Sequence, residues 1–242
     1  TPYMKEFLAD IHMHTLASGH AYGTIREMAQ AAALRNLSMI GISEHAPGIA
    51  GTMDPTYYLN LEVIPRKLFG VEVYHGCEIN VLDGGKLSLE ERYIRYLDYA
   101  IVGIHTMCYD ASDVRKNTDD LIACMAHPKI KLVSHPDDSR TPVDYTRLVP
   151  AAKELGVALE VNNSSLRPNA SRLNAWENYR VMLPLCRELE VPVIVDSDAH
   201  DPSAVGVLCY AKKLLEELDF PEELVLSTDP DKLTAFLELS KN

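Results

Sequence analysis

The sequence has few basic residues, and they are not clustered. Its 242 residues include 23 Lys and Arg against 35 Asp and Glu, which gives a formal net charge of -12. A protein that tracks long nucleic acids neutralises phosphates with grouped Lys and Arg, and an anionic membrane surface attracts the same residues. The acidic balance therefore excludes both as partners. It also disfavours a strongly anionic small ligand unless another group supplies local positive charge.

Long apolar stretches and paired cysteines are also missing. No run approaches the ~20 apolar residues that span a bilayer, and the first residues show no signal-peptide pattern. The five cysteines are an odd number without CxxC spacing, which favours reduced thiols packed as small buried side chains. These features predict a cytoplasmic protein. Because no Gly-, Ser- or Pro-rich linker interrupts the chain, we expect one domain over residues 1–242.

Short apolar segments alternate with stretches of helical periodicity. The segments are rich in Val, Ile and Leu, as buried parallel strands are. Thr24 and Glu27 have capping-box spacing at the start of the first predicted helix. The repeated strand–helix order predicts a parallel α/β fold. The predicted strands are 7–12, 38–43, 71–78, 99–105, 131–134, 158–162 and 193–197, and the predicted helices are 24–35, 117–126, 144–155, 173–190, 203–218 and 231–239.

Seven of the nine histidines and two carboxylates fall at or just beyond the ends of predicted strands. In a parallel α/β barrel the C-terminal ends of the strands meet on one face, so these side chains are expected to converge there. Residues two apart on a strand share a face, which lets one strand end aim two side chains at one point. The nine residues are His12, His14, His20, His45, Glu78, His105, His135, Asp198 and His200.

Imidazole together with carboxylate is a ligand set for Zn²⁺, Mn²⁺ or Fe. One histidine at a strand end is more often an ordinary surface or core residue, so a single HxH pair would be weak evidence. Packing alone does not place so many polar groups on one rim, because each needs a partner when it is buried. The set therefore predicts a metal centre. His75 lies within a predicted strand and His127 ends a predicted helix, so we interpret both as structural.

With these residues in place, the chain resembles the PHP (polymerase and histidinol phosphatase) family, and within it the small YcdX-like phosphatases. The resemblance runs almost from end to end. Its most specific stretches are Asp-Ile-His-Met-His-Thr-Leu-Ala-Ser-Gly-His-Ala-Tyr (10–22), Ser-Glu-His-Ala-Pro-Gly (43–48), Leu-Glu-Val-Asn-Asn-Ser-Ser (159–165) and Ser-Asp-Ala-His (197–200).

The resemblance implies a distorted seven-stranded (β/α) barrel, similar to a TIM barrel, with three divalent metal ions. The ions would most often be zinc, with manganese or iron as alternatives, and the resemblance is compatible with a homotrimer. By this resemblance one ion would be held by His12, His14, Glu78 and Asp198, a second by Glu78, His105 and His135, and a third by His20, His45 and His200. Glu44 stands where relatives usually carry Asp, at a position that is not a ligand.

Nine ligands for three ions, with Glu78 used twice, leave coordination positions open for water or phosphate oxygens. Metal coordination lowers the pKa of bound water toward ~7 and so supplies a hydroxide nucleophile. We therefore predict hydrolysis of small phosphomonoesters, with metal carrying the positive charge that the side chains lack. Asp10 is a candidate to orient a ligand imidazole, although a solvated turn residue fits it equally. Arg167 is a candidate phosphate-binding residue, and a surface arginine is the alternative.

Three other functions remain open at this stage. Histidinol phosphate is one candidate substrate. Phosphodiester chemistry on nucleotides or short oligonucleotides is a second, since short substrates need few phosphate contacts. A non-catalytic module with a purely structural metal site is a third, but such a module would be expected to have lost ligands, and all nine are present.

Overall fold

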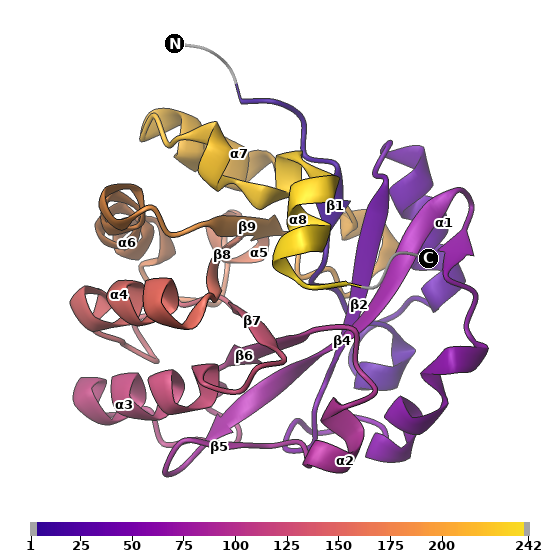
Figure 1. Ribbon diagram of the computed structural model, residues 1–242, viewed down its shortest axis with the longest axis horizontal. Coiled ribbons are helices and arrows are strands. Elements are labelled where there is room, and N and C mark those ends of the chain that lie inside the picture. The colour runs from indigo at the N-terminus through magenta and orange to yellow at the C-terminus, as the bar shows by residue number, and fades with distance from the viewer. Residues whose placement is uncertain (1–3, 240–242) are drawn as a thin grey trace.

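The computed structural model describes residues 4–239, and within this range a parallel sheet forms the centre of the molecule (Figure 1). Its strands pair in the order β1–β2–β4–β6–β7–β8–β9, each parallel to the next. Two short strands, β3 and β5, pair antiparallel with β4. The strands are β1 Ala9–Asp10, β2 Met39–His45, β3 Lys67–Leu68, β4 Val71–Leu82, β5 Lys86–Leu87, β6 Ala100–Gly103, β7 Ile130–Val133, β8 Ala158–Asn162 and β9 Val193–Asp196.

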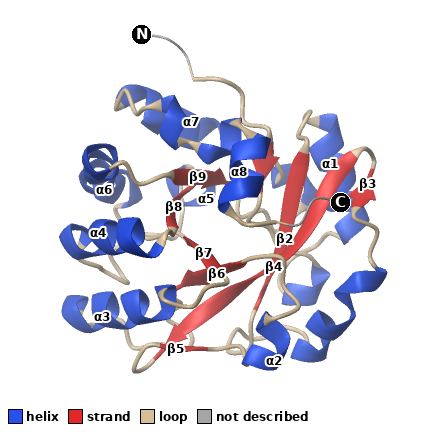
Figure 2. Cartoon of the chain, in the orientation of Figure 1, coloured by secondary structure: helices blue, strands red, loops and turns tan. Residues whose placement is uncertain are grey.

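Helices surround the sheet on its outer face (Figure 2). In Figure 1, α3, α4 and α6 lie in a row along one side, and α8 lies across one end of the barrel. Short 3₁₀ turns fill several of the connections. The α-helices are α1 Ile25–Leu34, α2 Glu91–Ile94, α3 Val114–Met125, α4 Tyr145–Leu155, α5 Asn163–Leu166, α6 Ala175–Leu189, α7 Cys209–Glu217 and α8 Pro230–Phe236.

The first and last strands of the sheet order, β1 and β9, come together and nearly close the barrel. Met13 forms an isolated parallel bridge with Ala199 just beyond the two strands. Two carboxylates replace ladder bonds at this seam: the backbone NH of Ile11 donates to Asp196 Oδ1 at 2.9 Å, and the NH of Ser197 donates to Asp10 Oδ1 at 3.1 Å. The predicted α/β class and the distorted seven-stranded barrel are thus confirmed.

The barrel interior is filled by inward side chains at the end opposite the strand C-termini. Tyr99 occupies the centre, where a Cβ at Gly41 or Gly76 would overlap its ring. Its hydroxyl donates to the carbonyl of Ile11 across the barrel. Leu233 of α8 packs into the same cluster and covers this end. With one end filled, the other end is available for a site.

The predicted elements agree with the structure in kind, and 158–162 agrees in its bounds. Helix α1 begins with the predicted capping box, in which Thr24 Oγ1 accepts from the Glu27 NH and Glu27 Oε1 accepts from the Thr24 NH. The prediction that Glu78 ends its strand is wrong. Strand β4 continues to Leu82 and forms a hairpin with β5, which places Glu78 in mid-strand.

The predicted helix 203–218 exists, but its predicted start is wrong. A short 3₁₀ turn, Pro202–Ala204, is followed by Gly206 with a φ of 71°, and α7 starts only at Cys209. The NH of Gly206 donates to Asp10 Oδ2 at 2.9 Å. This bond turns the chain toward the barrel seam, and the positive φ suits glycine and interrupts the helix.

Two further outcomes concern the thiols and the membrane. Cys77, Cys124 and Cys186 are buried as predicted, whereas Cys108 is half-buried and Cys209 is exposed at the start of α7, so the prediction of burial for all five was too broad. Within residues 4–239 no helix combines the length and apolar character needed to cross a bilayer.

Candidate metal centre

The predicted ligands follow a simple positional rule along the chain. His12, His105, His135 and Asp198 each lie two residues beyond the end of a strand, namely β1, β6, β7 and β9. His14 and His200 lie two residues further on, and His45 is the last residue of β2. His135 and Asp198 adopt φ values of 27° and 53°, a left-handed backbone that is uncommon in residues other than glycine and is found at functional sites.

Four donor atoms from three strands form a compact group. The atoms are Nε2 of His12, Nε2 of His14, Oε1 of Glu78 and Oδ1 of Asp198, and five of the six separations among them are 3.2–3.3 Å. A tetrahedral zinc ion with bonds of ~2.0 Å holds its donor atoms about 3.3 Å apart. These four atoms therefore lie at the vertices of a shell that fits one such ion.

The second oxygen of Glu78 faces two other histidines. Glu78 Oε2 lies 3.3 Å from His105 Nε2 and 3.1 Å from His135 Nε2. Because its two oxygens point to different histidine groups, Glu78 can bridge two ions. Its mid-strand position supports this arrangement, since the residue pairs in register with His45 on one side and Ile101 on the other.

The third predicted group is more open. The rings of His20 and His45 have centroids 5.2 Å apart, and those of His20 and His200 are 5.0 Å apart. His14, His45 and His200 place one donor atom each within 4.8 Å of one another. His20 is exposed, whereas His45 is buried. The structure thus brings all nine predicted ligands to one face, with His20 at its edge.

Several buried atoms in this group lack a hydrogen-bond partner among the described residues. A buried polar atom without a partner costs about 1–3 kcal/mol, so a cluster of them needs an explanation. All of them belong to predicted ligands, and unpartnered imidazole and carboxylate atoms are the chemistry of a cation site. The unpartnered atoms are His45 Nδ1, Glu78 Oε2, His105 Nδ1, His135 Nε2 and Asp198 Oδ1. The residues present therefore fit divalent metal ions.

The electrostatics of the group separate two kinds of histidine. Burial disfavours the protonated form of His12, but Asp198, Glu160 and Glu78 together outweigh burial and raise its pKa well above the usual value. Burial likewise opposes protonation of His14, but Asp198 and Glu78 raise its pKa to about 9. The two carboxylates thus require nearby positive charge, which a metal ion supplies in place of these protons.

Three other histidines of the group, His45, His105 and His200, stay neutral. Burial and the neighbouring His14 lower the pKa of His45, and the same two causes lower the pKa of His200 to about 4. Burial also lowers the pKa of His105. Neutral imidazole is the form that binds metal, so these three side chains are ready to act as ligands near pH 7.

The carboxylate that holds a predicted ligand imidazole is Glu160, not Asp10. Glu160 Oε2 lies 2.7 Å from His12 Nδ1, and Glu160 Oε1 accepts from the backbone NH of His135 at 2.9 Å. Asp10 instead accepts from the backbone NH groups of Ser197 and Gly206 at the barrel seam. Neither interpretation of Asp10 is correct, because its carboxylate is buried and bonded at the seam, while His12 faces the mouth of the barrel.

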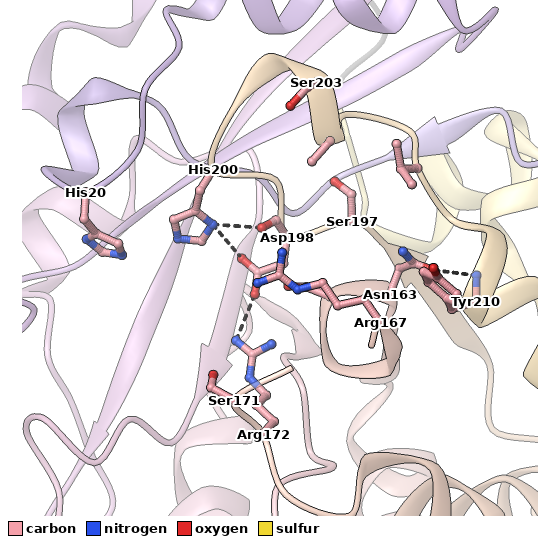
Figure 3. Close-up of a pocket in the computed structure, with 13 residues that line it drawn as sticks. His20, Asn163, Arg167, Ser171, Arg172, Ser197, Asp198, His200, Ser203 and Tyr210 are labelled. Atoms are coloured by element: carbon pink, nitrogen blue, oxygen red, sulfur yellow. Dashed lines mark hydrogen bonds and ion pairs between the residues drawn. The ribbon is translucent and has the colours of Figure 1, made fainter. Parts of the chain in front are cut away.

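Arg172 is a second residue that the sequence analysis missed. Its Nη2 donates to Asp198 Oδ2 at 3.0 Å (Figure 3). Its Nη1 donates to Ser165 Oγ at 3.0 Å. Asn162 Nδ2 also donates to Asp198 Oδ2, at 3.2 Å. The predicted Arg167 lines the same cavity of about 490 Å³ without touching Asp198. No spacing signal marks Arg172, which lies in a loop before α6.

Glu44, which stands where the family resemblance leads us to expect Asp, lies buried beneath the loop that follows β1. Glu44 Oε1 accepts from the Thr15 NH at 2.8 Å and from Ser18 Oγ at 2.7 Å. Ser18 Oγ in turn lies 3.0 Å from His14 Nδ1 and accepts from the NH of His45 at 3.1 Å. Glu44 therefore supports the candidate site through Ser18.

Comparison with known proteins points to the same family as the sequence. The model of the PHP domain family matches residues 10–163. A protein named a probable phosphatase from Caldanaerobacter subterraneus is 40% identical over 231 residues, covering 95% of this chain and 90% of the relative. Another from Clostridium novyi is 34% identical over 234 residues, covering 96% and 95%.

A solved structure shares the fold. The histidinol phosphate phosphatase of Lactococcus lactis, described as complexed with zinc, L-histidinol and phosphate, superposes with a TM-score of 0.59. The match covers 91% of this chain and 95% of that one, at 14% sequence identity. The likeness at that identity concerns the barrel alone. The family match over most of the chain and the relatives along nearly its whole length show that the chain belongs to the PHP domain family.

Proposed function

We propose that this protein hydrolyses small phosphomonoesters at a centre of three divalent metal ions, zinc in the first instance. The observation that carries the proposal is the four-atom shell of His12, His14, Glu78 and Asp198, in which five of the six separations are 3.2–3.3 Å. Glu78 Oε2 with His105 and His135 would hold a second ion, and His20, His45 and His200 a third. The relatives named probable phosphatases support the reaction class.

Bound divalent ions would supply positive charge to the phosphoryl oxygens and an activated water. The chain's own residues do the positioning. Glu160 fixes the ring of His12, and Asn162 and Arg172 hold Asp198 Oδ2 so that Oδ1 faces the shell. Such supporting contacts orient ligands and sharpen their geometry.

The candidate metal centre lies beside a cavity at the C-terminal end of the barrel strands. A cavity of about 480 Å³, lined by His45, Glu78, His105 and His135 among others, opens over the shell. A cavity of this size holds a small phosphorylated metabolite and not a long polymer. The net charge of -12 agrees with a small substrate. Histidinol phosphate and mononucleotides are both small phosphomonoesters, so they are tested as alternative substrates of the same hydrolysis reaction.

The test uses p-nitrophenyl phosphate with purified, metal-loaded protein. We expect turnover that a chelator abolishes and added Zn²⁺ or Mn²⁺ restores. Asp198→Asn should lower kcat/KM by at least a hundredfold, because a buried ligand charge is lost. Asp231→Asn, an exposed carboxylate on α8 at the opposite end of the barrel, is the matched control and should behave like the wild type.

Two results would overturn the proposal. If the metal-loaded protein hydrolyses neither p-nitrophenyl phosphate nor any member of a panel with histidinol phosphate and mononucleotides, the phosphatase assignment fails. If elemental analysis after saturation finds fewer than two metal equivalents per chain, the three-ion centre fails even where activity is present.

A further inference from the structure

Two cavities meet at the candidate metal centre, one on each side of Asp198. The first, of about 490 Å³, extends past Arg167 toward Tyr210, and the second, of about 480 Å³, extends past Met107. They share their lining at the centre, through His20, Ser171, Arg172, Asp198 and His200. A phosphoryl group at the centre therefore has two directions in which the rest of a substrate can lie.

The first cavity, here called the Arg167 cavity, carries positive charge that no carboxylate balances. Arg172 is committed to Asp198 through a 3.0 Å ion pair. Within residues 4–239, Arg167 has no carboxylate within ion-pair distance and its guanidinium donates no hydrogen bond. Figure 3 shows its side chain running from the end of α5 toward Asp198. The chain has 12 more acidic than basic residues, yet no carboxylate pairs with this guanidinium, which leaves its charge available to a ligand.

The other walls of the Arg167 cavity offer neutral hydrogen-bond donors. Ser164 and Ser171 line it beside Arg167, whereas the hydroxyl of Ser203, also in the lining, already donates to Asp201 Oδ2 at 2.6 Å. Asp198 is the carboxylate in the lining. Hydroxyl groups beside a guanidinium suit an anion, since hydroxyls donate to oxygens that the guanidinium attracts. The Arg167 cavity therefore suits an oxyanion, which Arg167 and the hydroxyls of Ser164 and Ser171 can bind.

The second cavity has the opposite character. Ile49, Ile104 and Met107 form apolar walls. Its additional arginine, Arg140, is neutralised by Asp138 through contacts of 2.8 Å to 3.2 Å with both carboxylate oxygens. An anionic group would find no unpaired cation there. The charge distribution therefore selects the Arg167 cavity for the anionic part of a substrate.

We propose that the Arg167 cavity is a leaving-group subsite that binds a second anionic group. The preferred substrates would then be small phosphomonoesters whose alcohol part carries a carboxylate or another phosphate. This inference rests on the proposed phosphatase function and deepens it. Arg167 acts as a specificity residue, because it contacts the part of the substrate that leaves and not the phosphoryl group under attack.

The experiment compares esters that differ only in that anionic group. 2-Phosphoglycerate and glycerol 2-phosphate differ in one carboxylate against one hydroxymethyl group. Propane-1,3-diol bisphosphate and its monophosphate provide the arm with a second phosphate. The wild type should favour the anionic member of at least one pair by about tenfold in kcat/KM, because a charge-assisted contact is worth about 1.4 kcal/mol, or tenfold. The pair that shows the preference identifies the anion as a carboxylate or a phosphate.

Variants assign the preference to a residue. Arg167→Gln should lower the ratio of kcat/KM values within the pair about tenfold, and Arg167→Lys should restore part of it, because a point charge remains. Arg140→Gln is the matched control on the other cavity and should leave the ratio unchanged. Calorimetric binding of non-hydrolysable phosphonates tests the subsite without turnover. Phosphonoacetate should bind to the wild type more tightly than 2-hydroxyethylphosphonate, and Arg167→Gln should remove this difference in affinity.

The inference and the proposed function fail in different ways. If p-nitrophenyl phosphate is hydrolysed but Arg167→Gln leaves every ratio and the phosphonate difference unchanged, the subsite is wrong and the phosphatase assignment stands. A loss of preference in Arg140→Gln would place the anion in the second cavity and also overturn the subsite. If no ester is turned over but phosphonoacetate binding depends on Arg167, the phosphatase assignment fails while the anion site remains.

Discussion

Glu160 Oε2 lies 2.7 Å from Nδ1 of His12, on the side of the ring away from Nε2, which faces Glu78 and Asp198. The two residues are 148 positions apart in the chain. A carboxylate behind a metal-binding imidazole fixes its tautomer and orientation and raises its basicity. The same carboxylate accepts from the backbone NH of His135, so one side chain from β8 supports two of the predicted metal ligands.

We predict that Glu160→Gln lowers metal affinity 10- to 100-fold while the fold is retained. The amide oxygen still accepts from His12 Nδ1–H, but the charge is lost and the amide nitrogen cannot accept from the NH of His135. Competition with a chromogenic chelator measures the affinity. Glu154→Gln, an exposed glutamate on α4, should not change it. Wild-type affinity in Glu160→Gln would show that the contact has no role in metal binding.

Glu44→Asp tests the buried carboxylate beneath the loop after β1. Removing one methylene withdraws the carboxylate from Thr15 and Ser18, which leaves buried donors short of partners. We expect a loss of about 1–3 kcal/mol in the free energy of unfolding, measured by urea denaturation. Glu177→Asp, at an exposed position on α6, serves as the control for the shortening itself. Equal stability of Glu44→Asp and wild type would mean that the loop adapts to either length.

His75→Met tests a buried imidazole away from the metal centre. His75 is 2% exposed and neither ring nitrogen has a partner among the described residues. Burial, opposed by Asp98 and assisted by Arg66, lowers its pKa from 6.5 to about 4. Protonation therefore favours the unfolded chain, so the wild type loses stability as pH falls from 6.5 toward 4, and the loss for this group is about 3 kcal/mol.

In His75→Met this contribution is absent, since methionine does not titrate and fills a similar volume. The difference in unfolding free energy between variant and wild type should thus grow in favour of the variant as pH falls from 6.5 to 4. Urea titrations of both proteins at several pH values measure it. A difference that stays constant with pH would contradict the lowered pKa.

Gly103→Ala probes the space beside Glu78. A Cβ at this position would overlap Ser134 Oγ and lie 3.6 Å from Glu78 Oε2. We expect a loss of about 1–3 kcal/mol in stability from overpacking. The double variant Gly103→Ala with Ser134→Ala removes the overlapping oxygen, so its loss should be smaller than the sum of the two single losses. Additive losses would show that the oxygen is not the obstacle.

Much of the fold could be predicted because the signals are local. The Val, Ile and Leu content of segments such as 158–162 predicts strands, and Thr24 with Glu27 predicts a helix start. Failures occurred where a distant partner decides the local conformation. The residues after Ala204 do not continue a helix, because Gly206 bonds to Asp10 from the first strand. Glu78 lies in mid-strand because β5 pairs beyond it.

The sequence by itself determined the family, the barrel and the side chains that meet at its mouth. Those side chains could be predicted because the C-terminal ends of parallel strands in a barrel meet on one face. Only the tertiary structure decided which groups support them. Glu160 reaches His12, and Arg172 reaches Asp198, because the curvature of the barrel brings β8 and the following loop against β1 and the end of β9. These contacts depend on side-chain direction and on barrel closure, and neither can be predicted from the spacing of residues along the chain. The same closure turned Asp10 to the seam and left Arg167 beside an open cavity.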